Sequence, residues 1–394
     1  MLFSPLHQSR LRRLVYLAGF FVHASVALNT YITSSFFAQF VGESNVGIVY
    51  VLISLLMLAL ALNAQQIVEL SGVRRTLIGT LILSFLTGVG MTALASVWSG
   101  VVLAILHLAV TYLLIIALDL YLEHLSADAV TGTIRGIFLT LINLAYLFSP
   151  FLASVALERY GFGAVFAVST VALIPLAFIF WDGLAELPRR EYERVSIWHT
   201  GRRLWRATTR LARDVRNIVL LDFVLNFFYA IMVIYEPIYL HQYLGLSWPA
   251  IGIIFTVMLL PFVLLDLILG RIADRLWGEK ELMLAGLVIM AAVAFAMPFF
   301  ASASIILWAV ILFISRLGAA ALEMMKESYL FKKIDSKDIN TIFLSRSMYP
   351  LAYVVAPLLA SLVLWVAPFQ MLFTMLGFVV VLGLPLAWQL KDTR

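Results

Sequence analysis

The chain lacks cysteine and is poor in charged residues. The absence of cysteine from its 394 residues excludes disulfide bonds, thiolate metal sites and thiol nucleophiles. Only 12% of the residues are charged and 63% are hydrophobic, whereas a soluble domain is about 45–50% apolar. A chain this apolar cannot cover itself with polar surface, so its solvent is lipid.

Sequence motifs of several enzyme classes are also missing. There is no G-x-x-x-x-G-K-[ST] loop to cradle a nucleotide, and no DDxxD or HExxH cluster that would hold a metal ion or perform acid–base chemistry. ATP-driven pumping by this chain is therefore disfavoured. We predict that the protein is not an enzyme and needs no cofactor.

Twelve continuous apolar runs are each long enough to cross a hydrocarbon core of about 30 Å, which takes roughly 20 helical residues. The strands of a β-barrel would alternate between polar and apolar residues, and these runs do not. The predicted fold class is an all-α integral membrane protein with twelve transmembrane helices. The runs are 14–40, 46–66, 76–96, 100–122, 134–157, 162–181, 218–240, 248–270, 281–300, 303–325, 341–366 and 369–390.

The basic residues predict the orientation of the chain. If the N-terminus is cytoplasmic, Arg159 is the one of the 27 Lys and Arg residues that falls in an outside segment, while Arg316 and Arg346 lie within spans. This asymmetry follows the positive-inside rule. It predicts a protein of the bacterial inner (cytoplasmic) membrane with both termini cytoplasmic. The net charge of +5 then reflects loops that face anionic lipid rather than nucleic-acid binding.

The sequence contains an internal repeat. Residues 145–154 (AYLFSPFLAS) match residues 352–361 (AYVVAPLLAS), 207 positions later, and two further matches have offsets of 204 and 206. Parallel halves of this kind are one arrangement of secondary transporters. We predict an N-terminal six-helix half (1–181), a cytoplasmic linker with a basic amphipathic helix (182–216) and a C-terminal six-helix half (217–394).

The stretch LGRIADRLWGEK, together with LGLSWPAIGIIF before it, resembles the major facilitator superfamily. That family carries the pattern G-x-L-a-D-R-x-G-R-K between the second and third helices of each half. The residues on the pattern are Gly270, Ala273, Asp274, Arg275, Gly278 and Lys280. The first-half copy, AQQIVELSGVRR, keeps Gly72, Arg74 and Arg75 but has lost the acid.

The resemblance implies that this motif closes the cytoplasmic side of the transporter. We expect Asp274 to meet Arg135 at the start of span five, with Arg271 or Arg275 meeting Asp119 or Glu123. Permanent structural ion pairs are the alternative. The Ala- and Ser-rich stretches around Pro150 and Pro357 loosely resemble the family's antiporter motif, but their occurrence in both halves favours close helix packing.

Polar residues within spans are costly, so they are the candidates for function. In the resembled family, spans one, four, seven and ten surround the central cavity. On this basis we predict that the substrate is bound by His23, Asn29, His107, Asn226, Tyr229 and Arg316. Each histidine also has the simpler interpretation of a hydrogen-bonded packing residue.

Span seven carries the longest polar stripe, from Asp222 through Asn226 and Tyr229 to Glu236. Asp222 and Glu236 are the predicted proton-coupling candidates, although Glu236 at the outer end could instead snorkel to the surface. Arg316 needs either a carboxylate partner or an anionic substrate. The expected partners were acids of the same half, namely Glu323, Asp222 or Asp266.

The predicted function is secondary active transport of a small solute by alternating access, as a monomer, with proton coupling and export both open. The partners are then the solute, protons and the bilayer, with no nucleic acid and no metal. The alternatives are a transporter-like membrane sensor and a lipid-modifying membrane enzyme. The sequence does not specify the substrate.

Overall fold

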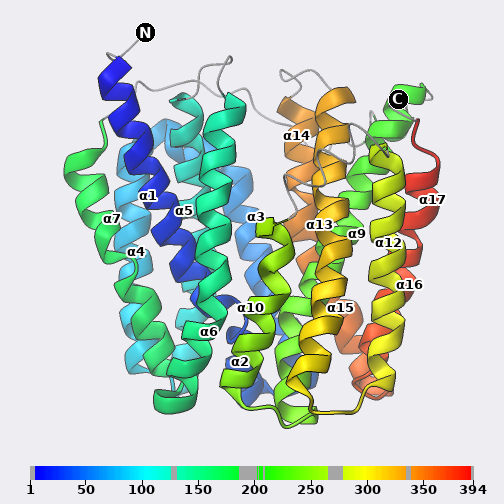
Figure 1. Ribbon diagram of the computed structural model, residues 1–394. Helices are drawn as coiled ribbons and strands as arrows, with labels where there is room; N and C mark the ends of the chain where they lie inside the picture. Colours follow the sequence, from blue (N-terminus) through cyan, green and yellow to red (C-terminus); the bar gives the residue numbers. More distant parts are fainter. Residues whose placement is uncertain are drawn as a thin grey trace. The chain divides into compact units, whose positions relative to one another are not determined.

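The structure is a computed structural model that describes residues 5–125, 131–185, 202, 204–206, 209–264, 278–333 and 339–391. All regular structure in this part of the chain is helical, which confirms the predicted fold class (Figure 1). Ten of the described helices are long and apolar enough to span a membrane, so this is an integral membrane protein.

Two features reconcile ten spans with the twelve that were predicted. The span Ile137–Trp181 contains Gly161, whose φ of 77° and ψ of −177° divide it into two helices. Trp248–Leu264 is a shorter apolar helix. The described residues are therefore consistent with twelve crossings.

The chain separates into two compact units. Unit 1 comprises residues 1–42, 52–193 and 247–252, and unit 2 comprises 43–51, 194–246 and 253–394. Two helices are divided between the units: each unit contains the first residues of one helix, and the rest of that helix belongs to the other unit. These helices are α3 (Val46–Ser71) and α10 (Trp248–Leu264).

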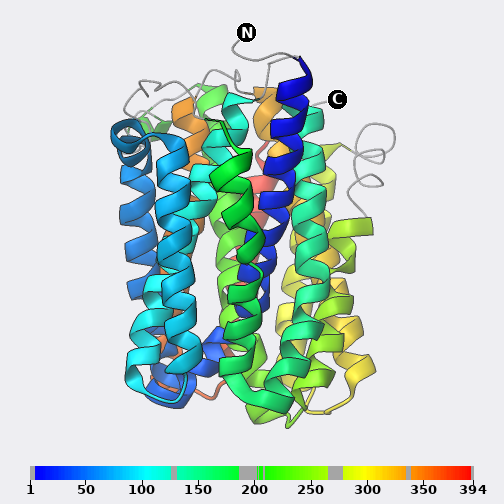
Figure 2. The ribbon, with the colours of Figure 1, turned by 90° about the vertical axis from the view of Figure 1, so that its left-hand side faces the viewer.

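Unit 1 is a bundle in which α1 packs on α6 and α4 packs on α5 (Figures 1 and 2). Apart from α3, its elements are α1 (Pro5–Thr30), α2 (Thr33–Val41), α4 (Val73–Ala93), α5 (Trp98–His124), α6 (Thr131–Val171), α7 (Ile174–Phe178) and the π-helix η2 (Ile179–Gly183).

The predicted first span is broken into α1 and α2 at residues 31–32. The hydroxyls of Thr30 and Thr33 donate to the carbonyls of Val26 and Asn29, and Ile32 N–H reaches back to Asn29 O at 3.2 Å. Side chains that bond to the preceding turn compete with the regular helical ladder. The break therefore lies in the polar stretch around Asn29.

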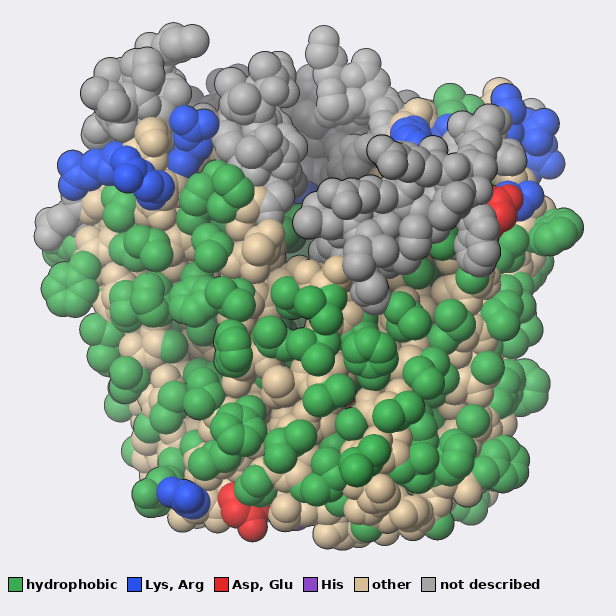
Figure 3. Space-filling view, in the orientation of Figure 1, with side chains coloured by type: hydrophobic (Ala, Val, Ile, Leu, Met, Phe, Trp, Pro, Cys, Tyr) green, Lys and Arg blue, Asp and Glu red, His purple; other side chains and the backbone are tan. Residues whose placement is uncertain are grey.

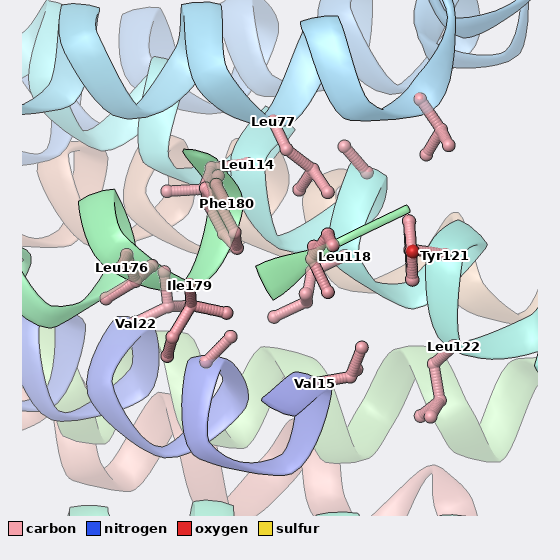
Figure 4. Close-up of a cluster of buried hydrophobic side chains, with 14 of the residues drawn as sticks. Val15, Val22, Leu77, Leu114, Leu118, Tyr121, Leu122, Leu176, Ile179 and Phe180 are labelled. Carbon is pink, nitrogen blue, oxygen red and sulfur yellow. The ribbon is translucent and has the colours of Figure 1, made fainter. Parts of the chain in front are cut away.

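The apolar core of unit 1 lies where α1, α4, α5 and the α7–η2 segment meet. Figure 4 shows Val15 and Val22 from α1 facing Leu114 and Leu118 from α5, with Phe180 from η2 among them. All five side chains are buried. Because the surrounding lipid is equally apolar, close packing rather than hydrophobic expulsion holds these helices together.

Unit 2 is built around α9, which is buried along most of its length and packs against α13, α15, α16 and α17. Besides parts of α3 and α10, its elements are the 3₁₀-helix η1 (Glu43–Asn45), α9 (Arg210–Ile238), the π-helix η3 (Tyr239–Tyr243), α12 (Glu279–Ala296), the 3₁₀-helix η4 (Met297–Phe299), α13 (Ile305–Lys333), α14 (Ile339–Arg346), α15 (Met348–Val366), α16 (Met371–Val381) and α17 (Gly383–Trp388).

The start of α9 lies inside the predicted linker. Thr209 caps the helix by accepting a hydrogen bond from Ala212 N–H at 3.3 Å, which satisfies one of the free N–H groups of the first turn. Span seven is therefore longer than its apolar run. Of the basic stretch at 201–216 in the predicted linker, residues 202 and 204–206 are helical and 210–216 form the start of α9, while 201, 203, 207 and 208 lie outside the described residues.

The sequence repeat reappears as matching hydrogen bonds in the two units. Tyr121 Oη donates to Ala185 O at 2.9 Å in unit 1, and Tyr329 Oη donates to Lys391 O at 2.9 Å in unit 2. The donors are 208 positions apart and the acceptors 206 apart, close to the offsets found in the sequence. In each unit the fourth helix is thus tied to the chain beyond the sixth.

The prolines of the antiporter-like stretches occupy matching sites beside a glycine. In unit 2, a Cβ built on Gly47 would lie 2.4 Å from Ser361 Oγ and 2.5 Å from Pro357 O. In unit 1, a Cβ on Gly252 would lie 1.9 Å from Ser154 Oγ and 3.0 Å from Pro150 O. Only glycine lets these backbones approach so closely, in agreement with the close packing that the sequence favoured.

The surface of each unit suits a membrane protein. Hydrophobic side chains cover the side walls in Figure 3, while Lys and Arg gather at the end of each unit that carries its chain terminus. Exposed apolar residues such as Leu52, Phe178 and Trp365 are typical of a wall that faces lipid.

We expect Gly47→Ala to destabilise the protein, because the added methyl group overlaps Ser361 and Pro357. The cost of such overpacking is about 1–3 kcal/mol. The measurement is the melting temperature of the detergent-purified protein. Gly79→Ala in α4 is the matched control, since nothing lies within 4 Å of its Cβ position. Equal melting temperatures for the two variants would contradict the close approach at Gly47.

Candidate functional site

A line of polar residues runs along α9 and meets a second line on α13. Asp222, Tyr229 and Glu236 are seven positions apart, so they lie on one face of α9. Their partners on α13 are Lys326, Glu323 and Arg316 in that order. We call these six residues the α9–α13 ladder; all of them belong to unit 2.

The first rung centres on the Asp222 carboxylate, which is well satisfied. Lys326 Nζ lies 2.5 Å from its Oδ1, and Ser345 Oγ on α14 donates to its Oδ2 at 2.6 Å. Asn226 Nδ2 donates to Oδ1 at 3.0 Å and to the Asp222 backbone carbonyl at 2.8 Å. The carboxylate therefore has an ion pair and two further side-chain donors, as a buried charged group normally does.

The second rung is a hydrogen bond from Tyr229 Oη to Glu323 Oε2 at 2.6 Å. A bond this short is typical of a hydroxyl that donates to a carboxylate. Tyr229 also places its ring 5.7 Å from the Arg316 guanidinium. It therefore connects the second rung to the third.

The third rung pairs Glu236 with Arg316, whose nearest nitrogen lies 3.6 Å from Glu236 Oε2. The exposed fraction is 0% for Glu236 and 1% for Arg316. The snorkelling interpretation of Glu236 is therefore wrong. The ion-pair partner of Arg316 is Glu236, which the register of α9 on α13 brings to it, rather than Glu323 or Asp222. The third expected partner, Asp266, lies outside the described residues.

This last rung is poorly saturated. Neither carboxylate oxygen of Glu236 accepts a hydrogen bond, and neither Nη1 nor Nη2 of Arg316 donates one. The Arg316 guanidinium carbon lies 5.1 Å from the centre of the Phe228 ring, so aromatic faces supply part of its stabilisation. A separation of 3.6 Å also exceeds the about 2.7–2.9 Å of a charge-assisted hydrogen bond.

Glu236 stands where α9 is locally distorted. Pro237 follows it inside the helix and cannot donate to the preceding turn, and the π-helix η3 begins at Tyr239. Short π-helical segments widen a helix and are frequent at functional sites. The sequence signal for this feature is the Glu-Pro pair itself.

The predicted site residues of unit 1 have local partners. His23 Nδ1 lies 2.8 Å from Gly19 O, and its ring packs edge-on against Phe138. His107 Nδ1 lies 3.1 Å from Thr87 Oγ1 and 3.0 Å from Ser84 O. Among the described residues, each histidine is hydrogen-bonded to its own neighbours, which is the packing interpretation.

Asn29 is the unit 1 candidate that keeps an unused polar atom. Its Nδ2 donates to Ser25 O at 3.2 Å and to Ser169 Oγ at 3.0 Å, while its buried Oδ1 has no hydrogen-bond partner. The buried hydroxyls of Ser34 and Ser35, just beyond the helix break, also lack partners. These atoms make the break between α1 and α2 the most polar unsatisfied region of unit 1 in the described chain.

Most of the predicted gate motif lies outside the described residues. This applies to Gly270, Arg271, Asp274 and Arg275 and to the side chain of Arg135. The expected latch between Asp274 and Arg135 therefore stays a prediction. Gly278 is described and is the residue before α12, with an extended φ of −72° and ψ of 169°.

Residues at the end of each motif copy connect the third helix of the half to neighbouring helices. In unit 1, Arg74 donates to the carbonyls of Phe180 and Trp181 within η2. In unit 2, Lys280 lies 5.2 Å from the centre of the Trp388 ring, and the buried Glu279 pairs with Lys332. Arg74 and Lys280 thus play matching roles 206 positions apart.

Sequence reasoning missed Lys326 and Ser345. The apolar run of span ten ends at residue 325, one position before Lys326, whereas α13 continues to Lys333. The signal was present as Glu323 and Lys326 three positions apart, which is one turn of helix. Ser345 carried no signal, because its role depends on α14 packing against α9.

Among the described residues, no group of three or more His, Cys, Asp and Glu side chains is arranged to hold a metal ion. The ladder itself contains charged residues of both signs. They lie in membrane-spanning helices of a chain whose two units share a repeated pattern. Such an arrangement is typical of a secondary transporter.

The comparisons with known proteins agree with this class. Residues 15–325 and 220–394 match the profile of the Major Facilitator Superfamily, and the chain belongs to that family. The solved structure of a POT family transporter in complex with 5-aminolevulinic acid is similar in fold, with a TM-score of 0.74 and 11% sequence identity. The similarity covers 95% of this chain and 94% of that one. No curated protein matches the sequence.

The first rung of the ladder predicts a coupled response to mutation. Lys326→Met leaves Asp222 as a buried, unpaired charge and should cost about 3–5 kcal/mol of stability. The double variant Asp222→Asn with Lys326→Met should be more stable than the sum of the single effects by at least about 1 kcal/mol.

The measurement is the melting temperature of the purified single and double variants in detergent. Arg213→Met, which changes an exposed cation on α9, is the control and should shift the melting temperature little. Strictly additive effects of Asp222→Asn and Lys326→Met would mean that the pair does not interact.

Proposed function

We propose that this protein is a proton-coupled secondary transporter that moves a small solute across the membrane by alternating access. Membership of the transporter family and the helical fold support the transport part of the proposal. The proton part rests on the charge balance of the α9–α13 ladder. The predicted orientation, with both termini cytoplasmic, is retained as part of the proposal.

The ladder contains one more acid than base. Its acids are Asp222, Glu236 and Glu323, and its bases are Lys326 and Arg316. A surplus carboxylate in an apolar helix bundle is costly unless it binds a proton or another cation. A solute carrier in which protons bind and leave one buried acid needs such a group.

The geometry favours Glu236 over Asp222 for this role. Asp222 already has an ion pair with Lys326 and hydrogen bonds from Ser345 and Asn226. Glu236 has no hydrogen bond and only a loose ion pair, so it loses least when it takes up a proton. It also lies beside the Pro237 distortion, where a change of backbone geometry is easiest.

The test uses the purified full chain in proteoliposomes with an imposed pH gradient of either sign. Uptake is measured for lactate, succinate, inorganic phosphate, glucose and ethidium, and pyranine inside the vesicles reports proton movement. At least one compound should accumulate, by up to about tenfold per pH unit for one-proton coupling. A protonophore should abolish the accumulation.

Glu236→Gln should lose gradient-driven accumulation and keep solute exchange between vesicle and medium, because exchange needs no release of the proton. Glu281→Gln, which alters an exposed acid of α12, is the matched control and should behave as the unmodified protein. The proposal of proton coupling fails if every compound that the protein moves does so independently of the pH gradient.

A further inference from the structure

The third rung of the ladder differs from the first in how its charges are satisfied. Asp222 has a cation at 2.5 Å and hydrogen bonds from Ser345 and Asn226. Glu236 and Arg316 are more deeply buried, yet four of their charged atoms, two on each side chain, have no hydrogen-bond partner. Buried charged groups are normally paired and hydrogen-bonded, so this rung has unused binding capacity.

The unused capacity of Arg316 has a defined shape. Phe228 and Tyr229 lie 5.1 Å and 5.7 Å from its guanidinium carbon, and Arg316 Nη1 and Nη2 are the nitrogens without partners. Two neighbouring donors on a planar guanidinium match the two oxygens of a carboxylate or phosphate. Glu236 satisfies neither donor, since its nearest oxygen lies 3.6 Å away.

We propose that Arg316 binds a carboxylate group of the transported solute, which takes the place of Glu236. The inference rests on the proposed transport function and names the class of solute. Glu236 holds the position in the absence of solute and prevents the guanidinium from remaining as a lone buried cation. The incoming carboxylate gains the two hydrogen bonds that Glu236 does not make.

Displacement links the solute to a proton. Once Arg316 binds the carboxylate of the solute, Glu236 remains buried, with 0% exposure, and has lost its cation. A buried carboxylate without a cation takes up a proton. Among the described residues, Arg316 of α13 is the charged group that forms an ion pair with Glu236. One proton therefore enters with one carboxylate.

The charge balance distinguishes a carboxylate from a phosphate, although both fit the guanidinium. A carboxylate brings one negative charge, which the proton on Glu236 cancels, so the net charge of the rung is unchanged. Doubly ionised phosphate carries a second negative charge for which the rung has no further cation. We therefore assign a solute with a single carboxylate at this position, and phosphate becomes an outcome of the test.

The test measures binding to the purified full-length protein by calorimetry and by the shift in melting temperature. The probes are lactate, succinate, inorganic phosphate, glucose and ethidium. The unmodified protein should bind a carboxylate, with an affinity that falls up to about tenfold per pH unit where Glu236 ionises. Glucose and ethidium should not compete with it.

Three variants and one control sharpen the measurement. Arg316→Gln should weaken carboxylate binding by roughly ten- to a hundredfold, because charged hydrogen bonds are lost. Arg316→Lys should weaken carboxylate binding by about tenfold, because an ammonium group cannot donate the two parallel hydrogen bonds of a guanidinium. Glu236→Gln should bind at least as tightly as the unmodified protein and independently of pH. Arg75→Gln, an exposed arginine of α4, should change nothing.

Several results would overturn the inference while leaving transport intact. These are phosphate binding as tight as that of every carboxylate, or gradient-driven uptake of glucose or ethidium that Arg316→Gln does not alter. If Arg316→Gln fails to fold, Arg316→Lys and Glu236→Gln decide, and weaker binding to Glu236→Gln refutes the displacement. Carboxylate binding with the expected variant pattern but no uptake would support the site and refute the proposed transport.

Discussion

The pairing of fixed charges between α9 and α13 is the interaction on which unit 2 depends. A charged side chain inside an apolar helix bundle has no water to solvate it, so the fold must bring a partner to it. Asp222, Tyr229 and Glu236 recur every seven residues on α9, and each meets a polar residue of α13. Sliding one helix past the other by a turn would separate all three pairs at once. The ladder therefore fixes the register of the two helices.

The two units share their backbone contacts and differ in their charges. The tyrosine hydrogen bonds from Tyr121 and Tyr329 and the glycine contacts at Gly252 and Gly47 are repeated. The buried polar residues are not: His23 and His107 of unit 1 are hydrogen-bonded within their own unit, whereas unit 2 holds ion pairs along α9. Duplication preserved the packing, and within the described residues unit 2 adds the ion pairs between α9 and α13.

Within the ladder, the rungs differ in how many hydrogen bonds satisfy their charges, and this difference is the basis for proposing a structural role for the first rung and a transport role for the third. The carboxylate of Asp222 is both ion-paired and hydrogen-bonded, as expected of a structural pair that holds helices together. Glu236 and Arg316 are buried but loosely paired beside a proline and a π-helix. A charged group that exchanges partners during transport must break its existing hydrogen bonds each time. Having few such bonds therefore makes the exchange easier.

The spans, the repeat and the identity of the polar residues followed from the amino-acid sequence by itself. Hydropathy is a local property, so the apolar runs predicted the helices, although not the break at residues 31–32 or the extension of α13 past Lys326. The polar stripe on α9 was visible as a helical spacing. The partner of each member was decided only by tertiary structure. Arg316 and Glu236 lie 80 positions apart, and no local pattern reports the register that brings them together. The sequence therefore determined which residues carry the charge, and the packing of α9 on α13 decided which charges meet and which remain unsatisfied.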